Sequence, residues 1–142
     1  MDKKSVDLSE YRFKRAEDLL AQAKLLHENN KYDGSINRSY YSIFNGIRSL
    51  LALLKLDSSK HSGVISLFDK HFVKTNILEK SYSEIVHSAF NIRQENDYED
   101  FYVPTETESE IQIKDCENFL DIVEKVRDKI ISGNIKLPHI SN

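Results

Sequence analysis

Residues 35–51, SINRSYYSIFNGIRSLL, give the strongest structural signal in the chain. Apolar side chains recur there every three or four residues, the period that places them on one face of an α-helix. The pattern continues to residue 54, so one apolar face runs over roughly five helical turns. The side chains of that face belong to Ile36, Tyr40, Ile43, Phe44, Ile47, Leu50, Leu51 and Leu54.

The same spacing predicts four further helices, at residues 8–30, 62–73, about 78–98 and about 107–131. We therefore expect one all-α domain over residues 1–142, a four- to five-helix antiparallel bundle with a short tail at about 133–142. Gly133 should end the last helix. Residues 134–137, NIKL, are the one candidate for a strand. The residues expected to cap helix starts are Ser9, Asp33 or Ser35, His61 or Ser62, and Thr107 or Ser109.

Composition narrows the classes of protein that this chain can form. Four glycines and two prolines are too few for the turns of a β-sandwich or barrel. Cys116 is the only cysteine, which excludes an intramolecular disulfide and fits a reducing compartment. No segment approaches the ~20 apolar residues of a membrane span, and the N-terminal region lacks the apolar core of a signal peptide. We expect a cytoplasmic protein without membrane association.

Charge is distributed unevenly along the chain. Residues 1–93 contain 15 Lys and Arg against 11 Asp and Glu, whereas residues 94–142 contain 5 against 12. The overall net charge of -3 argues against a generic polyphosphate binder. Any nucleic-acid contact would have to come from a local basic surface in the first two-thirds of the chain.

The second helix has a polar flank beside its apolar face. Arg38, Tyr41, Asn45 and Arg48 are spaced at i, i+3, i+7 and i+10, so they line one side together. This flank is either a solvated helix surface or the wall of a groove that binds phosphate. In the second case the two arginines would be bidentate donors and the Tyr41 ring could stack on a base.

Residues 91–104, NIRQENDYEDFYVP, are the second candidate site. Arg93 directly follows the last residue of the fourth helix's apolar face, so we expect it at the edge of that face, where it need not be buried. Asn96 and Asp97 follow at i+3 and i+4 and can share its side of the helix; Arg93–Asp97 could equally be an ordinary surface pair. The apolar face itself consists of Leu78, Tyr82, Ile85, Ala89 and Ile92.

We expect no metal and no cofactor. Glu84 and His87 have the i, i+3 spacing of helical di-iron sites, but no second Glu-x-x-His exists in the chain. Nucleophilic catalysis is also unsupported, since nothing in the sequence pairs Ser62 with both a base and an orienting acid, and Cys116 has no adjacent histidine. The free backbone N–H groups at the start of the third helix, beside Lys60, could instead hold an anion.

Four segments give the chain a family resemblance: YRFKRAEDLLAQAKLL, SINRSYYSIFNGIRSLL, KHSGVISLFDKHFVK and IRQENDYEDF. They cover residues 11 to about 102 and resemble small prokaryotic HEPN-domain proteins, the helical partners of minimal nucleotidyltransferases. The resemblance implies a helical bundle that pairs as a homodimer. It also implies that active relatives are metal-independent ribonucleases, which use an arginine and a histidine with four to six residues between them.

This chain departs from that pattern where the histidine should be. Arg93 carries over, but the corresponding positions are occupied by Tyr98, Glu99 and Asp100. Free tyrosine titrates near pH 10, so Tyr98 is a poor proton carrier at neutral pH. The resemblance therefore favours a binding module of a toxin–antitoxin or defence-type pair, with RNA, a nucleotide or a nucleotidyltransferase as its ligand. The alternatives are a weak ribonuclease that uses Arg93 with a substitute proton carrier such as Tyr98, and a purely structural interaction protein that makes contact through residues 99–104.

Overall fold

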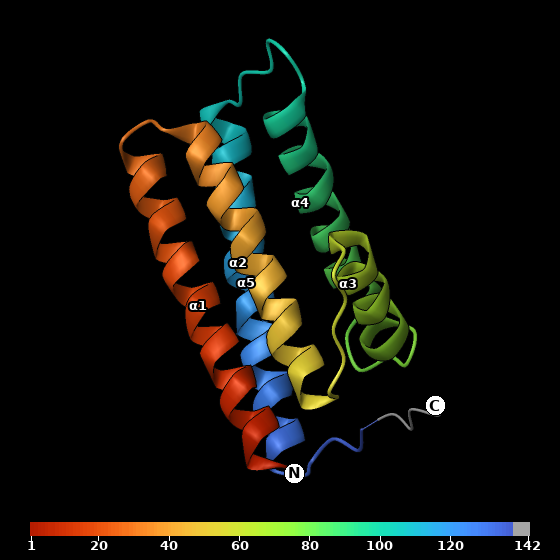
Figure 1. Ribbon diagram of the computed structural model, residues 1–142. Helices are drawn as coiled ribbons and strands as arrows, with labels where there is room; N and C mark the ends of the chain where they lie inside the picture. The colour runs from red at the N-terminus through yellow and green to blue at the C-terminus, as the bar shows by residue number, and fades with distance from the viewer. Residues whose placement is uncertain (138–142) are drawn as a thin grey trace.

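The computed structural model describes residues 1–137, which form a bundle of helices without any strand in that range (Figure 1). The all-α prediction is confirmed, and the strand candidate at 134–137 is wrong. Residues 138–142, the end of the expected tail, lie outside the described part. The helices are α1 (Lys3–Glu28), α2 (Tyr32–Leu53), α3 (His61–Phe68), α4 (Lys80–Tyr98) and α5 (Glu106–Ile131), with a π-helical turn at Asp69–Val73 after α3.

Helix α2 is the centre of the bundle. It contacts α1, α3, α4 and α5, and in Figure 1 it runs between α1 on one side and α4 on the other. Every residue of its predicted apolar face is buried. The burial of these large apolar side chains supplies the main favourable free energy of folding. The segment with the clearest periodicity in the sequence is thus the helix around which the others pack.

A second face of α2 consists of small residues: Ser35, Ser39, Ser42, Gly46 and Ser49, all buried. Hydroxyl groups on this face join α2 to α1. The Ser35 hydroxyl donates to the Ala23 carbonyl at 2.8 Å, and the Ser42 hydroxyl donates to the Ala16 carbonyl at 2.6 Å. Small side chains let two helix backbones approach closely, so α1 and α2 pack over most of their length.

Gly46 serves the opposite contact, with α5. A Cβ atom at this position would lie 3.0 Å from the Leu120 Cδ2 atom and 3.4 Å from the Phe119 ring. Any larger side chain would push α5 away from α2. The absence of a side chain therefore sets the separation of these two helices.

Ser9 and Arg127 connect three helices in one buried cluster. The Ser9 hydroxyl donates to the Ser49 carbonyl of α2 at 2.6 Å and accepts a hydrogen bond from Arg127 Nε of α5 at 2.8 Å. The Arg127 guanidinium also pairs with Glu10 at 2.8 Å and lies 5.1 Å from the centre of the Phe13 ring. The expectation that Ser9 caps the first helix is wrong, because α1 begins at Lys3 and is capped by Asp2.

The other expected caps are wrong for similar reasons. Neither α2 nor α3 has a side-chain cap, so Asp33 lies inside the first turn of α2 and His61 begins α3 without capping it. Helix α5 is capped by Thr105, whose side chain and that of Glu108 form a reciprocal capping box. Ser109 is instead buried in α5, where its hydroxyl lies 2.8 Å from His27 Nδ1. Gly133 follows α5 with φ of +82°, as expected of a residue that ends a helix.

Cys116 lies in the core between α2 and α5. It is fully buried, and burial is the main reason why the pKa of its thiol rises to about 12. At neutral pH almost none of it is the reactive thiolate. Its role in the fold is that of a small apolar side chain.

The small-residue face of α2 makes a testable prediction. Ser42→Leu should lower the free energy of unfolding by about 1–3 kcal/mol, because the larger side chain has no space against α1 and the hydrogen bond to Ala16 is removed. Ser66→Leu, on the exposed side of α3, is the control and should stay within about 0.5 kcal/mol of the parent. Urea titration measures both values, and equal losses would mean that the α1–α2 contact can accommodate large side chains.

Candidate functional site

Two cavities open along the flank of α2 and meet at the same two residues, Asn37 and Arg38. The α1–α2 cavity, of about 330 Å³, lies between these two helices. The α2–α4 cavity, of about 470 Å³, lies between the start of α2 and the end of α4. The first is lined by Arg15, Leu19, Gln22, Asn37, Arg38, Tyr41 and Asn45. The second is lined by Asp33, Gly34, Asn37, Arg38, Asn96, Asp97 and Tyr102.

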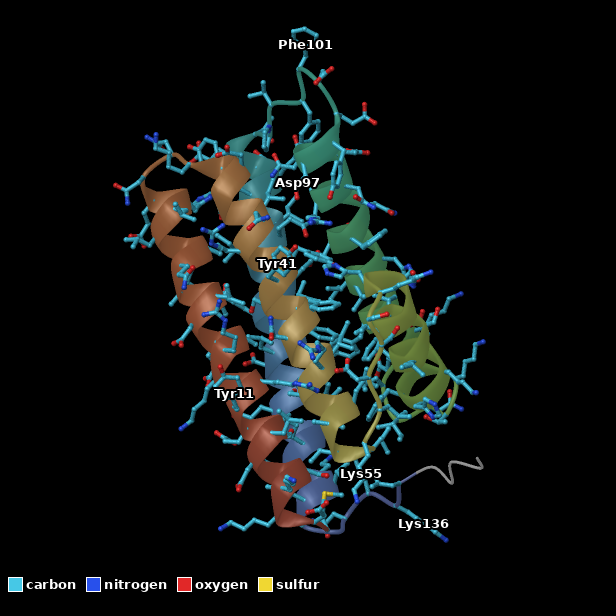
Figure 2. All side chains as sticks on the ribbon, in the orientation of Figure 1. Tyr11, Tyr41, Lys55, Asp97, Phe101 and Lys136 are labelled. Carbon is cyan, nitrogen blue, oxygen red and sulfur yellow. The ribbon has the colours of Figure 1, made fainter. Side chains whose placement is uncertain are left out.

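The cavities bring together five of the residues proposed from the sequence. Arg38, Tyr41 and Asn45 share the α1–α2 cavity, and Arg38, Asn96 and Asp97 share the α2–α4 cavity. Asn96 also donates to the Asp33 carbonyl at 3.0 Å, which fixes the end of α4 against the start of α2. In Figure 2 Tyr41 and Asp97 lie below the loop that carries Phe101.

The α1–α2 cavity is positively charged. Among residues 1–137, neither Arg15 nor Arg38 pairs with a carboxylate, and no acidic residue lines this cavity. Arg38 is held by neutral amides: its Nε donates to Gln22 at 3.2 Å and its Nη1 to Asn37 at 2.8 Å. Amide oxygens orient a guanidinium without neutralising it, so its charge remains available to an anion.

Arg93 lies among aromatic rings on the inner side of α4. Its guanidinium carbon is 5.4 Å from the centre of the Tyr40 ring, 5.5 Å from Tyr41 and 5.6 Å from Tyr98, distances typical of cation–π contacts. Its Nη2 donates to the Tyr41 hydroxyl at 3.0 Å. Its Nε lies 2.8 Å from an Asp97 oxygen as an ion pair, although the N–H is not aligned for a hydrogen bond.

Arg93 is covered more than its place at the edge of the predicted apolar face requires. Its side chain is only 13% exposed. On α4, Val86 and Ala89 are in the core and Tyr82, Ile85 and Phe90 pack against it; Arg93 lies one turn beyond Ala89 and Phe90. Ile92, which the sequence placed on the core face, is only half-buried.

His61 joins the same aromatic cluster, which the sequence did not predict. Its Nδ1 lies 2.7 Å from the Tyr40 hydroxyl, and its ring stacks on Phe44 with centres 4.3 Å apart. Burial first, then the charges of Arg93 and Arg48, lower the pKa of His61, so the ring is neutral at pH 7. The contact with Tyr40 fixes the orientation of the ring and leaves Nε2 without a partner among residues 1–137. Tyr40 is 21 positions away in the sequence, so no local pattern could show this pair.

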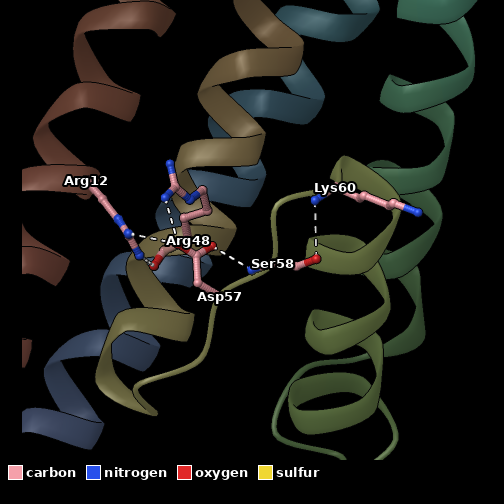
Figure 3. A network of polar contacts seen from close by, with 5 residues as sticks. All are labelled: Arg12, Arg48, Asp57, Ser58 and Lys60. Atoms are coloured by element: carbon pink, nitrogen blue, oxygen red, sulfur yellow. Dashed lines mark hydrogen bonds and ion pairs between the residues drawn. The ribbon is translucent and has the colours of Figure 1, made fainter.

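Arg48 does not join the cavities, although the sequence grouped it with Arg38. It binds Asp57 at 2.9 Å, and the same carboxylate oxygen lies 3.4 Å from Arg12 (Figure 3). Asp57 also accepts the Ser58 backbone N–H at 2.9 Å. Arg48 is therefore engaged by the loop between α2 and α3.

The α4–α5 loop exposes apolar side chains. Phe101 is fully exposed with φ of +66°, and Val103 is 79% exposed; Tyr98, the last residue of α4, is 70% exposed. Tyr102 instead donates to Glu108 from a half-buried position, and burial is the main reason why its pKa rises to about 12. Tyr98 reaches Arg93 only through its ring face.

Two features that would imply other functions are missing from the described helices and loops. None of the helices in residues 1–137 is long and apolar enough to cross a membrane. The same residues hold no group of three or more His, Cys, Asp or Glu that could bind a metal ion. His87, whose spacing from Glu84 is that of helical di-iron sites, pairs with Asp69 at 2.8 Å.

The relatives of this chain are small proteins of archaea and bacteria. It is 37% identical over 116 residues to "Putative toxin MJ0605" of Methanocaldococcus jannaschii, which covers 82% of this chain and 86% of that protein. It is 36% identical over 117 residues to a "UPF0332 protein" of Thermotoga maritima, which covers 82% of this chain and 89% of that protein. "Putative toxin MJ0142" of M. jannaschii is 34% identical over 121 residues, or 85% of this chain and 80% of that protein.

The family match covers most of the bundle. Residues 9–126, from the Ser9 cluster in α1 to the last turns of α5, match the HEPN domain. This range contains α2, both cavities and the aromatic cluster around Arg93. The expectation drawn from the four sequence segments is confirmed: this chain belongs to the HEPN domain family.

Proposed function

We propose that this protein is the HEPN component of a toxin–antitoxin-like pair and that it binds RNA through the α1–α2 cavity. The names of two relatives support the first part, since each is named "Putative toxin". The second part rests on one observation: two arginines without carboxylate partners among residues 1–137 converge on a cavity that has a tyrosine ring as one wall.

The chemistry of the cavity matches a nucleotide unit. Guanidinium groups bind phosphate oxygens in bidentate fashion, and the Gln22 and Asn37 amides already hold Arg38 in place. The Tyr41 ring offers a surface for a base, an interaction that tolerates any sequence. Asn45, one turn from Tyr41, adds an amide oxygen that can accept from a base or a ribose hydroxyl.

Arg93 supports this site from α4, through its contacts with Tyr41. Its hydrogen bond to the Tyr41 hydroxyl and its contact with the Tyr41 ring hold that ring in place beside the α1–α2 cavity. A ring that is already fixed loses little conformational entropy when a base stacks on it. Arg93 thus acts on the ligand through Tyr41.

A second candidate function is RNA cleavage, and the position of His61 favours it. His61 and Arg93 contact the same two rings, Tyr40 and Tyr41, so an imidazole stands near the arginine despite its absence from residues 98–100. When its proton is on Nδ1, His61 Nε2 can accept the proton of a ribose 2′-hydroxyl as the oxygen attacks phosphorus. The bond to the 5′-oxygen then breaks, and that oxygen takes a proton from water.

Partners are the third element of the proposal. The exposed Phe101 and Val103, in a loop otherwise rich in carboxylates, are suited to contact a second copy of the chain or a partner such as a minimal nucleotidyltransferase. If this loop were the only functional surface, the protein would be a purely structural interaction module. Variants of the loop and of the cavity separate these cases.

The cavity is tested by Arg38→Gln. Removal of a charge-assisted hydrogen-bond donor should weaken binding of a 12-nucleotide single-stranded RNA roughly ten- to a hundredfold at low salt. It should also reduce the slope of log affinity against log salt by about 0.7 for each phosphate that the protein no longer neutralises. Fluorescence anisotropy measures both quantities. Lys114→Gln, which removes the same charge from the exposed side of α5, should bind as the parent does; equal effects of the two variants would refute the cavity as the site.

Cleavage is tested by incubating the protein with total RNA in excess chelator, beside Arg93→Ala and His61→Asn. If the second candidate is correct, the parent cuts RNA without metal and each variant loses at least about 99% of the rate, as expected when a proton carrier or charge donor is removed. Circular dichroism of the variants checks that the helices are intact. Intact RNA after incubation with the parent would leave binding as the function.

The loop is tested by light scattering at micromolar concentration. We expect the parent to be a homodimer, and Phe101→Ser to shift it toward the 16.5 kDa monomer by removing an exposed ring from the interface. Tyr11→Ser, another largely exposed aromatic but on α1, should leave the mass unchanged. A parent that is monomeric under these conditions contradicts the dimer.

A further inference from the structure

A third cavity lies at the opposite end of the bundle, between the start of α1 and the loop that follows α2. It has a volume of about 540 Å³, within the range of small-molecule sites in proteins. Figure 2 shows Lys55, which lines it, at the end of the bundle away from Phe101. This cavity shares no residue with the α1–α2 cavity or the α2–α4 cavity.

The floor of this cavity is apolar. It is formed by Leu8, Ala52 and Leu56. Leu8 is 42% exposed, which leaves a large apolar side chain in contact with water. A ligand that covered it would remove that surface from water, at a gain of roughly 25 cal/mol for each Å².

The rim is positively charged, and its two carboxylates, Asp2 and Asp57, already form ion pairs. Asp57 is shared by Arg12 and Arg48 through a single oxygen, so two guanidinium groups face one carboxylate (Figure 3). The Arg12 side chain is only 12% exposed, which increases the cost of the unbalanced charge. The pKa of Arg12 is lowered by burial and then by Arg48, as expected for a cation that lacks a full counter-charge.

Lys4 and Lys55 add to this rim. Lys55 Nζ pairs with Asp2 at 3.2 Å, while Lys4 has no carboxylate partner among residues 1–137. When Arg48 is included, four basic side chains therefore face two carboxylates. The basic residues are Lys4, Arg12, Arg48 and Lys55, and the acidic residues are Asp2 and Asp57. An anionic group at the rim would restore the balance.

The backbone at Lys55 gives an independent indication. Its φ is +57°, and it occupies the position after the α2 C-cap at which helices usually place glycine. The hydrogen bonds from the Lys55 N–H to the Ala52 carbonyl and from the Leu56 N–H to the Leu51 carbonyl are those of a Schellman motif. A side chain here costs backbone strain that glycine avoids, and this side chain places an ammonium group at the cavity.

We propose that this third cavity binds a small amphiphilic anion: an apolar or aromatic body that lies on Leu8 and Leu56 and carries one carboxylate, sulfonate or phosphate group. The anionic group contacts Lys4, Lys55 and Arg12. The site is independent of RNA binding at the α1–α2 cavity, so either proposal can fail without the other.

The test uses isothermal titration calorimetry of the full chain with four probes. Three are the anions 2-naphthoate, naphthalene-2-sulfonate and 2-naphthyl phosphate, and the fourth is the neutral 2-naphthalenemethanol. We expect at least one anion to bind at least tenfold more tightly than the neutral probe, and the preferred anion identifies the chemistry of the head group. Lack of binding by all three anions at millimolar concentration overturns the proposal, as does equal binding of the neutral probe.

Lys55→Gly is the decisive variant, because it relieves the positive φ while it removes the charge. It should weaken binding of the preferred anion about tenfold and leave the thermal midpoint unchanged or higher. Leu8→Asp, which removes the apolar floor, should abolish binding. The control is Lys3→Gln, an exposed lysine on α1 that does not line the cavity, and it should bind as the parent does. If Lys55→Gly binds as tightly as the parent, or Lys3→Gln weakens binding equally, the proposed site is wrong.

Discussion

The close approach of α1 and α2 determines most of the other features of this bundle. Serines on one face of α2 allow it, and serine hydroxyls bonded to carbonyls of the neighbouring helix fix it. Because the two helices lie so near each other, their flanking side chains meet across a narrow seam. Arg15 and Gln22 of α1 thereby reach Arg38 and Tyr41 of α2. Larger residues between the helices would separate these groups, so the packing of the core and the geometry of the candidate site have one cause.

The sequence predicted the helices well and their details poorly. Long apolar periodicity identified α2 because every turn repeats the signal, whereas a cap depends on one side chain. Ser9, Ser35 and Ser109 are typical capping residues, yet each uses its hydroxyl in a contact with another helix. The extent to which Arg93 is covered could not be predicted, because α4 has apolar residues on two adjacent faces and Ile92, beside Arg93, is itself only half-buried.

Part of the candidate site could also be predicted from the sequence, because residues at helical spacing share one side of a helix. Arg38, Tyr41 and Asn45 share one helix, so their spacing predicts a common side, and Asn96 and Asp97 share another. That these two groups meet at Arg38 depends on how α4 crosses α2, and no local spacing records that. Arg48 follows the same helical spacing but pairs with Asp57. His61 belongs to the aromatic cluster through its contact with Tyr40, which is distant in the sequence. Contacts between elements, in short, could not be predicted from periodicity.

The buried Cys116 has a practical consequence for studying this protein. Its thiol is enclosed by the core and stays protonated, so maleimide and nitroxide reagents should leave it unmodified in the folded chain. A cysteine introduced on the surface would then be the only labelled position, without any need to remove the native one. Spin labels placed in the α4–α5 loop and along α1 could report distances within and between copies of the chain in solution.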